Sequence, residues 1–402
     1  PVVEARAGMP ARHPVRLRSA RAASVLGVPL PAAEIARLFS GLGLPFTRDG
    51  DDFLVEPPTW RFDLEIEEDL IEEVARLHGY DNIPAPVPRG PLAMLAQPEG
   101  QRPQARVRQL LVDRGYQEVV NFAFVEEAWE LDFAANVDLI RLANPIASQT
   151  AVMRSTLVGG LIANLVTNLR RKQGRVRLFE TGRIFRRAAQ ELPVDGFHQP
   201  WKLAGLAYGG ALPEGWGSGA RKVDFYDVKG DLEALLTPAA LRFERLVHPA
   251  LHPGRAAKML RDGVAIGCIG ELHPEWVQKY ELPMAPVVFE VDFAAVMATG
   301  VPAYAEVSKF PPVIRDLAIV VDRDLALQTL KDGLKGRLPG LVQDIQLFDL
   351  YAGKGVPENK KSLAFRIVMQ DTQRTLQDAE VELAVHQLVS CLEQAFAAQL
   401  RS

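Results

Sequence analysis

Apolar residues recur at helical spacing in the first part of the chain. They follow this spacing over residues 31–39 and again from about 64 to 77, and glycines close both stretches. Between them, residues 53–56 have the composition of a short strand, which two prolines end. Helices and short strands in so few residues predict a small compact module, placed at residues 10–85.

The middle of the chain follows a segment rich in proline and glycine, residues 86–102, which we expect to be a linker. From 103 to 301, helical and strand patterns alternate irregularly, which favours a mixed sheet over a doubly wound parallel one. The expected elements are a helix at 106–114, a helix after Ser155 as its N-cap, strands at 118–124 and 176–180, and a hairpin turning at 261–263.

The clearest pattern lies in the last segment, residues 308–401. Strands are predicted at 315–321, 342–351 and 362–369, helices at 325–338 and 378–398, and a short strand at the end. This βαββαβ order is that of the ferredoxin-like fold. The whole chain is therefore predicted to be an α+β protein of several domains.

Composition narrows the class of protein. The 402 residues are 48% hydrophobic and 24% charged, as in folded globular proteins. The formal net charge of −4 gives no general attraction to nucleic acid, so any such contact must come from local patches. The two cysteines lie far apart and suggest neither a disulfide framework nor a zinc site. With no membrane-length apolar run and no signal pattern, we expect an interior cut of a cytoplasmic protein without membrane contact.

An acidic run at residues 63–73 is the strongest local candidate for chemistry. On a helix, Asp69, Glu72 and Glu73 stand at positions i, i+3 and i+4, so their carboxylates converge on one face. Asp63 precedes the helix and could fold back toward them. Carboxylate oxygens in such a group suit Mg²⁺. The alternative is a solvated helix N-terminus whose acidic residues complement the helix dipole.

Basic and aromatic residues interleave in the last segment, where rings could stack on bases while cations hold phosphates. The candidates on chemistry are Phe310, Arg315, Tyr351 and Lys354. Because residues 308–402 hold 12 basic and 12 acidic residues, a solvated rim around core aromatics explains the pattern equally well. A denser basic cluster closes the helix after Ser155 and has the same two interpretations: Arg170, Arg171, Lys172, Arg175 and Arg177.

Motifs for independent catalysis are missing from the sequence. The glycine-rich stretch at 215–222 matches neither G-x-G-x-x-G nor the Walker pattern, and there is no H-E-x-x-H. His248 and His252 are separated by a proline, so a shared helical face for a metal is not expected. These residues are interpreted as structural loops.

Three longer stretches together resemble the bacterial-type phenylalanyl-tRNA synthetase beta chain. They are PPTWRFD through EEVARLHGY at 57–80, NPI through MRSTL at 144–157, and KFPPVIRD at 309–316 with YAGKG at 351–355. Their order matches the family, and the resemblance covers essentially the whole chain. It implies the C-terminal half of such a subunit, without the family's oligonucleotide-binding and editing modules.

The resemblance assigns a role to each part. The first module would be winged-helix-like and would hold Mg²⁺ where beta meets alpha, on Asp63, Asp69, Glu72 and Glu73. Residues 103–301 would form a degenerate class II synthetase fold without catalytic residues. Residues 308–401 would be a ferredoxin-fold anticodon-binding domain.

The function that this resemblance implies is that of a non-catalytic subunit. In an (alpha-beta)2 heterotetramer, a catalytic alpha subunit would use ATP and Mg²⁺ to attach phenylalanine to tRNA(Phe), while this chain supplies the interface and tRNA binding. Two alternatives remain open. The chain could be a stand-alone RNA-binding or assembly protein with the same fold, or a metal-dependent hydrolase that uses the acidic run.

Overall fold

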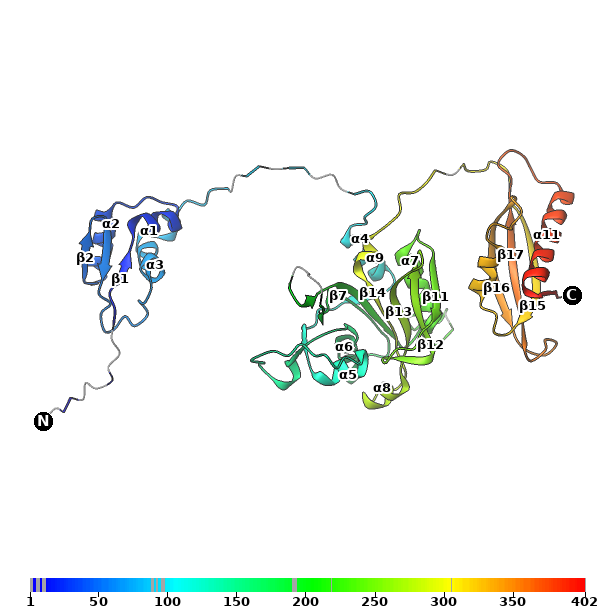
Figure 1. Ribbon diagram of the computed structural model, residues 1–402, viewed down its shortest axis with the longest axis horizontal. Coiled ribbons are helices and arrows are strands. Elements are labelled where there is room, and N and C mark those ends of the chain that lie inside the picture. The colour runs from blue at the N-terminus through cyan, green and yellow to red at the C-terminus, as the bar shows by residue number, and fades with distance from the viewer. Residues whose placement is uncertain are drawn as a thin grey trace. The chain divides into compact units, whose positions relative to one another are not determined.

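The computed structural model describes residues 3–4, 8, 12–87, 90–91, 93–94, 98–189, 194–217, 219–304 and 306–401. Contacts divide the chain into two compact units, Pro1–Ala96 and Gln97–Ser402 (Figure 1). The predicted start of the first domain, residue 10, and part of the predicted linker at 86–102 lie outside the described residues. The limits of the four predicted segments, 10–85, 86–102, 103–301 and 308–401, stay predictions.

The first unit is a small α/β module built around one core. Its antiparallel sheet has the order β1-β3-β2. The elements are β1 (Val15–Leu17), α1 (Ser19–Leu26), α2 (Ala32–Gly41), β2 (Phe46–Asp49), β3 (Asp52–Val55), α3 (Glu67–His78) and the 3₁₀ turn η1 (Tyr80–Asn82). The rings of Phe39, Phe46 and Phe53 meet with centroids 5.4, 5.6 and 6.0 Å apart. Both predicted helices and the predicted strand are present, whereas α1, β1 and β2 are too short to give a periodic pattern and were missed.

Helix α3 begins at Glu67, later than the predicted start near residue 64. Its third residue, Asp69, accepts hydrogen bonds through Oδ2 from the backbone nitrogens of Glu65 and Ile66, both at 2.8 Å. These bonds hold residues 65 and 66 in the non-helical geometry of a cap. The acidic run therefore divides between a cap and the first turns of the helix.

The second unit contains a seven-stranded sheet in the order β11-β12-β13-β14-β10-β7-β4. All neighbours are antiparallel except β4 and β7, so the predicted mixed sheet is confirmed. The strands are β4 (Gln117–Glu118), β7 (Val176–Arg183), β10 (Trp201–Tyr208), β11 (Leu241–Arg245), β12 (Leu251–Arg261), β13 (Val264–Leu272) and β14 (Val287–Asp292).

Helices cover both faces of this sheet (Figure 1). One core lies under α4 (Gln104–Asp113), α7 (Phe225–Leu236) and α9 (Phe293–Met297). The other lies under α5 (Glu127–Ala134), α6 (Val158–Arg170) and α8 (Pro274–Lys279). Smaller elements flank the sheet: β5 (Phe124–Val125), η2 (Ser148–Thr150), β6 (Val152–Met153), β8 (Arg186–Arg187) and β9 (Phe197–His198). Because strand side chains alternate between faces, the central strands β7, β10, β12, β13 and β14 contribute residues to both cores.

Two predictions for this unit were wrong in detail. The strand expected at 118–124 is only the two-residue β4 followed by irregular chain, because the segment leaves the sheet after Val119. Ser155 does not cap α6, and its buried Oγ has no hydrogen-bond partner among the described residues. The helix begins after Leu157, whose backbone N–H donates to Glu290 Oε1 at 2.7 Å. The carboxylate of Glu290 in β14 thus takes the place of a cap from a residue next to the helix in sequence.

The predicted hairpin at 261–263 is confirmed. Arg261 pairs with Val264 across the turn between β12 and β13. Asp262 and Gly263 both have positive φ, 51° and 80°. Such angles suit a two-residue hairpin turn, and Asp-Gly is one of the sequences that adopts it most readily.

The C-terminal part of the second unit has the predicted βαββαβ order. Its elements are β15 (Val313–Asp322), α10 (Leu327–Leu334), β16 (Val342–Tyr351), β17 (Lys360–Met369), α11 (Asp378–Phe396) and β18 (Gln399–Leu400), with sheet order β16-β17-β15-β18. Both helices pack on one face over alternate strand residues such as Ile319 and Phe365. The predicted helix at 325–338 is shorter than expected. In the part of the chain that the structure describes, no helix is both long and apolar enough to cross a membrane.

Candidate functional site

The acidic run on α3 places its most buried carboxylate among arginines. The side chain of Glu73 is 8% exposed, and its two oxygens pair with Arg61 at 2.9 Å and Arg76 at 2.5 Å. Burial alone would raise the pKa of Glu73, but the hydrogen bonds from the two arginines outweigh it, so the pKa is lowered. Glu73 is thus a charged, structurally engaged group.

The other three predicted magnesium ligands have different surroundings, although Asp63 shares Arg61 with Glu73. Asp63 pairs with the guanidinium of Arg61 at 2.7 Å, which lowers its pKa. Asp69 accepts the two backbone hydrogen bonds that form the cap of α3. Glu72 is exposed and makes no hydrogen bond or ion pair with any described residue. Among the described residues, no three acidic, histidine or cysteine side chains are grouped as a metal would need. As arranged here, the four carboxylates do not fit a cation, and the magnesium site stays a prediction.

Four large apolar side chains on the irregular chain before and after α5 are exposed. The residues concerned are Val120, Phe122, Val137 and Ile146, with 91%, 80%, 84% and 101% of their surface exposed. Their segments are held together because β5 pairs with β6 and Arg141 bridges Val152. We call these four residues the apolar patch. Large exposed apolar side chains on neighbouring segments are candidates for an interaction site.

The sheet face under α6 carries buried carboxylates that the sequence analysis missed. Glu180 accepts from Arg154 Nη1 at 2.6 Å and from Asn121 Nδ2 at 2.7 Å. Glu290 accepts from Thr156 Oγ1 at 2.9 Å, and burial raises its pKa. Each carboxylate is used by neighbouring protein donors, so the cluster ties α6 and the irregular chain before it to the sheet. The sequence does hold a signal for them, because Glu180 and Glu290 each interrupt an otherwise apolar strand pattern.

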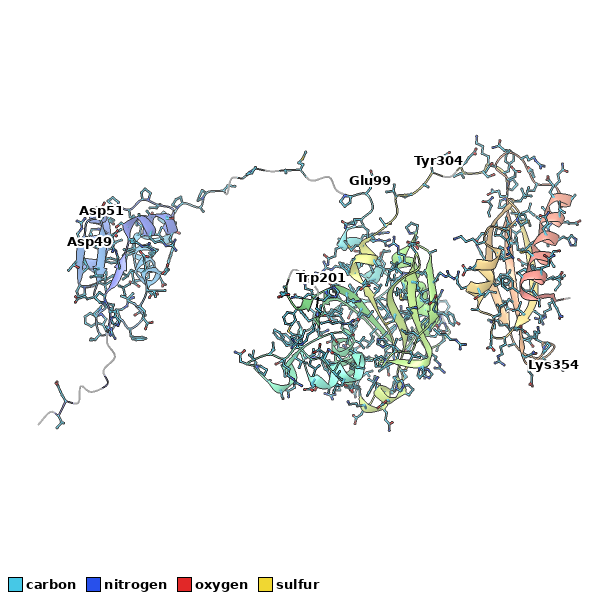
Figure 2. The ribbon with its side chains drawn as sticks, viewed as in Figure 1. Asp49, Asp51, Glu99, Trp201, Tyr304 and Lys354 are labelled. Atoms are coloured by element: carbon cyan, nitrogen blue, oxygen red, sulfur yellow. The ribbon has the colours of Figure 1, made fainter. Side chains whose placement is uncertain are left out.

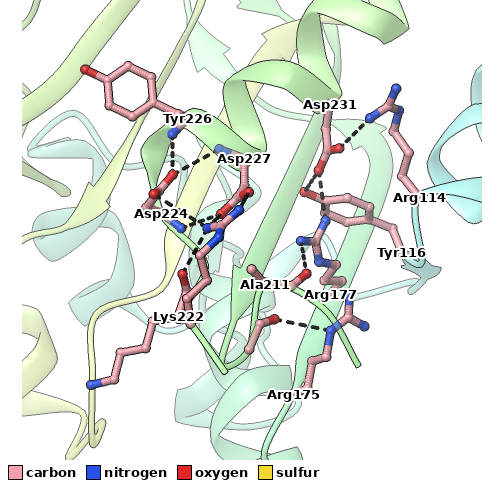
Figure 3. Close-up of polar contacts among 12 residues, drawn as sticks. Arg114, Tyr116, Arg175, Arg177, Ala211, Lys222, Asp224, Tyr226, Asp227 and Asp231 are labelled. Carbon is pink, nitrogen blue, oxygen red and sulfur yellow. Dashed lines mark hydrogen bonds and ion pairs between the residues drawn. The ribbon is translucent and has the colours of Figure 1, made fainter. Parts of the chain in front are cut away.

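A second polar cluster lies under α7 and includes part of the predicted basic cluster (Figure 3). Asp231 accepts from Arg114 Nη1 at 2.8 Å, from Tyr116 Oη at 2.9 Å and from Arg177 Nη1 at 2.9 Å. Burial, and then the charge of Asp231, raise the pKa of Tyr116, so its hydroxyl stays protonated and donates. Arg175 lies beside this group and donates through Nε to the Gly210 carbonyl at 3.2 Å.

The four RNA-binding candidates lie at two opposite ends of the C-terminal sheet. Tyr351 donates through its hydroxyl to the Lys354 carbonyl at 3.1 Å, at the tip of the β16–β17 hairpin (Figure 2). The guanidinium of Arg401 lies 5.0 Å from the centre of the Tyr351 ring. At the other end, Phe310 precedes β15, and Arg315 lies 3.6 Å from Asp378. The structure therefore brings Tyr351 and Lys354 into contact and places Phe310 and Arg315 at the other end of the sheet, with no contact between those two side chains.

The sheet face away from α10 and α11 carries further exposed chemistry. Arg366 pairs with Asp316 at 3.0 Å, and its guanidinium lies 5.2 Å from the centre of the Phe348 ring. Phe348 is 53% exposed. The strand alternation in the sequence could have pointed to these residues, because they occupy the positions between the buried ones.

Three family models match the chain in succession. The tRNA synthetase B5 domain matches residues 15–80, the phenylalanyl tRNA synthetase beta chain CLM domain matches 83–293, and the ferredoxin-fold anticodon binding domain matches 308–401. These matches agree with the α+β multidomain fold class. The finer winged-helix and class II descriptions are not tested by them.

Several similar proteins carry the name phenylalanine–tRNA ligase beta subunit. The protein from Dechloromonas aromatica is 75% identical over all of this chain and 51% of its own length. Those from Aromatoleum aromaticum and Ralstonia nicotianae are 57% and 53% identical over 98% of this chain and 50% of theirs. The chain thus spans about half the length of the relatives it matches. With the family's CLM model matching more than half of it, the chain belongs to the phenylalanyl-tRNA synthetase beta chain family.

Proposed function

We propose that this chain is a non-catalytic part of phenylalanine–tRNA ligase. It would bind a catalytic alpha subunit and tRNA(Phe), while the alpha subunit uses ATP to attach phenylalanine to the tRNA. The observation that carries the proposal is the succession of the three family models, which ends in an anticodon-binding domain. The relatives named as beta subunits of this ligase support it.

The apolar patch supports an alpha-subunit interface. Its side chains are almost fully exposed, and apolar side chains with this exposure are typical of surfaces that a partner covers. An (alpha-beta)2 heterotetramer is the assembly we propose. The expected location remains the cytoplasm.

The C-terminal sheet supports RNA binding. Phe348 and Tyr351 offer ring faces on which bases can stack, and Arg366, Lys354 and Arg401 can hold phosphates. Our proposal therefore adds the Phe348–Arg366 pair to the sequence candidates Phe310, Arg315, Tyr351 and Lys354.

A shared magnesium ion remains part of the proposal, carried by the sequence resemblance. Binding on Asp63, Asp69, Glu72 and Glu73 would require Glu73 to exchange at least one arginine partner for the ion. Within the described ranges no cluster of ligands is arranged to receive it, and no catalytic step is derived through this ion.

Reconstitution tests the proposal directly. The chain is mixed with a catalytic alpha subunit, ATP, Mg²⁺, phenylalanine and tRNA(Phe), and aminoacylation is measured with and without the chain. We expect a stable complex on size exclusion and tRNA charging that depends on it. If this polypeptide activated phenylalanine with ATP by itself, the assignment of chemistry to alpha would be wrong.

The alternative function is a stand-alone RNA-binding or assembly protein with the same fold. It predicts RNA binding without any stable complex with alpha. The hydrolase alternative predicts a metal-dependent activity that Asp69→Ala and Glu73→Ala abolish, whereas we expect no such activity in the parent chain.

A further inference from the structure

A pocket of about 630 Å³ opens beside the Asp231 cluster on the α7 side of the CLM-type domain. Three arginines from two parts of the chain line it: Arg114 at the end of α4, and Arg175 and Arg177 at the start of β7. Helix α7 forms another wall through Gly230 and Asp231. Figure 3 shows Arg114, Arg175 and Arg177 around this position.

Positive charge in this pocket is not fully balanced. Arg114 and Arg177 share the single carboxylate of Asp231. Arg175 has no ion pair with any described residue, and only its Nε donates a hydrogen bond, to the Gly210 carbonyl. Its two terminal nitrogens therefore remain as donors without a protein acceptor. Burial lowers the pKa of Arg175, and the neighbouring charge of Arg177 adds to this, which an anion would reverse.

The two remaining acidic side chains at the pocket do not cancel this excess. Asp227 is already paired with Arg221 at 2.5 Å. Asp113 accepts a hydrogen bond from the neutral Gln109 at 2.7 Å. The three lining arginines thus face only two carboxylates that have no cation partner outside this group, those of Asp113 and Asp231, so one positive charge is left over.

Helix α7 leaves space at the pocket wall where a side chain would be favourable for the helix. Gly230 lies in the interior of α7, where glycine is less favourable for the helix than alanine. A Cβ at this position would meet no atom within 4 Å. Packing therefore does not demand this glycine, and it keeps the pocket open.

We propose that this pocket binds a phosphate group, either as inorganic phosphate or as the phosphate monoester of a nucleotide. Guanidinium groups match the tetrahedral oxygens of phosphate with paired, charge-assisted hydrogen bonds. The terminal nitrogens of Arg175 would supply the principal donors, and Arg114, which is 38% exposed, would supply further ones. This site shares no residue with the RNA-binding surface proposed above, so its test does not depend on that proposal.

Calorimetric titration of the full chain with inorganic phosphate tests the site. Ionic strength is held constant with chloride, and the expected Kd is about 1 mM or tighter. Arg175→Gln removes the free donors, and we expect it to weaken binding by about tenfold or more. Arg175→Lys keeps the charge without the paired donors, so its affinity for phosphate should lie between those of the parent and of Arg175→Gln. The matched control is Arg141→Gln, an arginine paired with Glu127 elsewhere on the same domain.

A second pair of variants tests the site without touching a charge. Gly230→Leu fills the pocket and should abolish phosphate binding, whereas Gly230→Ala should leave part of it and raise the melting temperature. Circular dichroism verifies that each variant is folded. Because each route changes a different wall of the pocket, loss of fold in one variant leaves the other as the test.

Titration with a nucleoside 5′-monophosphate and its nucleoside distinguishes the sources. Tighter binding of the monophosphate than of inorganic phosphate, with no binding of the nucleoside, identifies a nucleotide monoester. Equal or weaker binding of the monophosphate identifies free phosphate. If neither ligand binds the parent chain, or if Arg175→Gln and Gly230→Leu bind as the parent does, the proposal is overturned.

Discussion

Two neighbouring residues of α3, Glu72 and Glu73, show why residue type alone does not define a site. Both are carboxylates in the predicted magnesium group. Glu73 points into the module and holds two arginines, while Glu72 points to solvent. Spacing on a helix predicts which side chains share a face, but the depth of that face depends on packing against β1 and α2, which the sequence does not reveal.

Replacing Glu73 by glutamine should destabilise the first unit in a pH-dependent way. The pKa of Glu73 is lowered below its ordinary value of 4.5, so its ionised form stabilises the fold above that pH. This contribution is lost as the pH falls through the lowered pKa. At neutral pH we expect Glu73→Gln to cost about 1–3 kcal/mol, and below the lowered pKa the difference from the parent should shrink. Urea denaturation at pH 7 and at acidic pH measures both.

Glu72→Gln is the control for this experiment. It removes one charge from the same turn, and without a partner it should change stability by less than about 0.5 kcal/mol at either pH. Equal effects of the two substitutions in metal-free buffer would contradict the structural role given to Glu73. A Mg²⁺-dependent stabilisation that both substitutions remove would instead support the predicted ion.

At the scale of the element, the cap of α3 explains where the acidic run becomes helical. Asp69→Ala removes the acceptor of the bonds from Glu65 and Ile66, and we expect a loss of about 1 kcal/mol in the free energy of unfolding. Asp69→Asn keeps a side-chain oxygen at the same place and should lose less. Urea denaturation measures the free energy of unfolding of both variants. A larger loss for Asp69→Asn than for Asp69→Ala would exclude the capping role.

A glycine in β10 lets the central strands of the seven-stranded sheet pack against a buried ring. Gly205 in β10 lies between Phe179 of β7 and Phe289 of β14. A Cβ on Gly205 would come within 2.4 Å of the Phe289 ring. Because the ring is buried in the core, Gly205→Ala should destabilise the domain by about 1–3 kcal/mol. Thermal unfolding measures this, with Gly230→Ala as the control that should be neutral or stabilising. A neutral Gly205→Ala would mean that the ring can move.

Predictability of the elements follows their length and regularity. The β12–β13 hairpin and β16 were predicted from sequence because alternating strands and an Asp-Gly turn leave few other structures. The end of the strand expected at 118–124 and the start of α6 were not, because distant residues decide them. Glu180 and Glu290 lie far along the chain from the segments whose backbone and side chains they hold. The same limit applies to the Asp231 cluster, whose members come from three separate parts of the sequence.

At the scale of the whole molecule, the apolar patch is costly to leave in water. Val120, Phe122, Val137 and Ile146 lie on irregular chain, and the buried Glu180 holds Asn121 between the first two of them. The interior of the domain is well filled without them, since both cores close under their own helices. Their exposure is therefore best explained by a partner that buries them, and the proposed partner is the alpha subunit.

This explanation predicts opposite effects on assembly and on stability. Phe122→Ser removes a ring that is 80% exposed, so the free energy of unfolding should change by less than about 0.5 kcal/mol. If alpha buries this ring at the centre of the interface, the same substitution should weaken the complex by about 2 kcal/mol, or roughly thirtyfold in Kd. Val264→Ser, at an exposed hairpin position outside the patch, is the matched control and should leave the affinity unchanged. Size exclusion and calorimetry with the alpha subunit measure the complex. Unaltered affinity of Phe122→Ser, Val120→Ser and Ile146→Ser would place the interface elsewhere, because a shared hydrophobic core cannot lose all three side chains without a loss of binding.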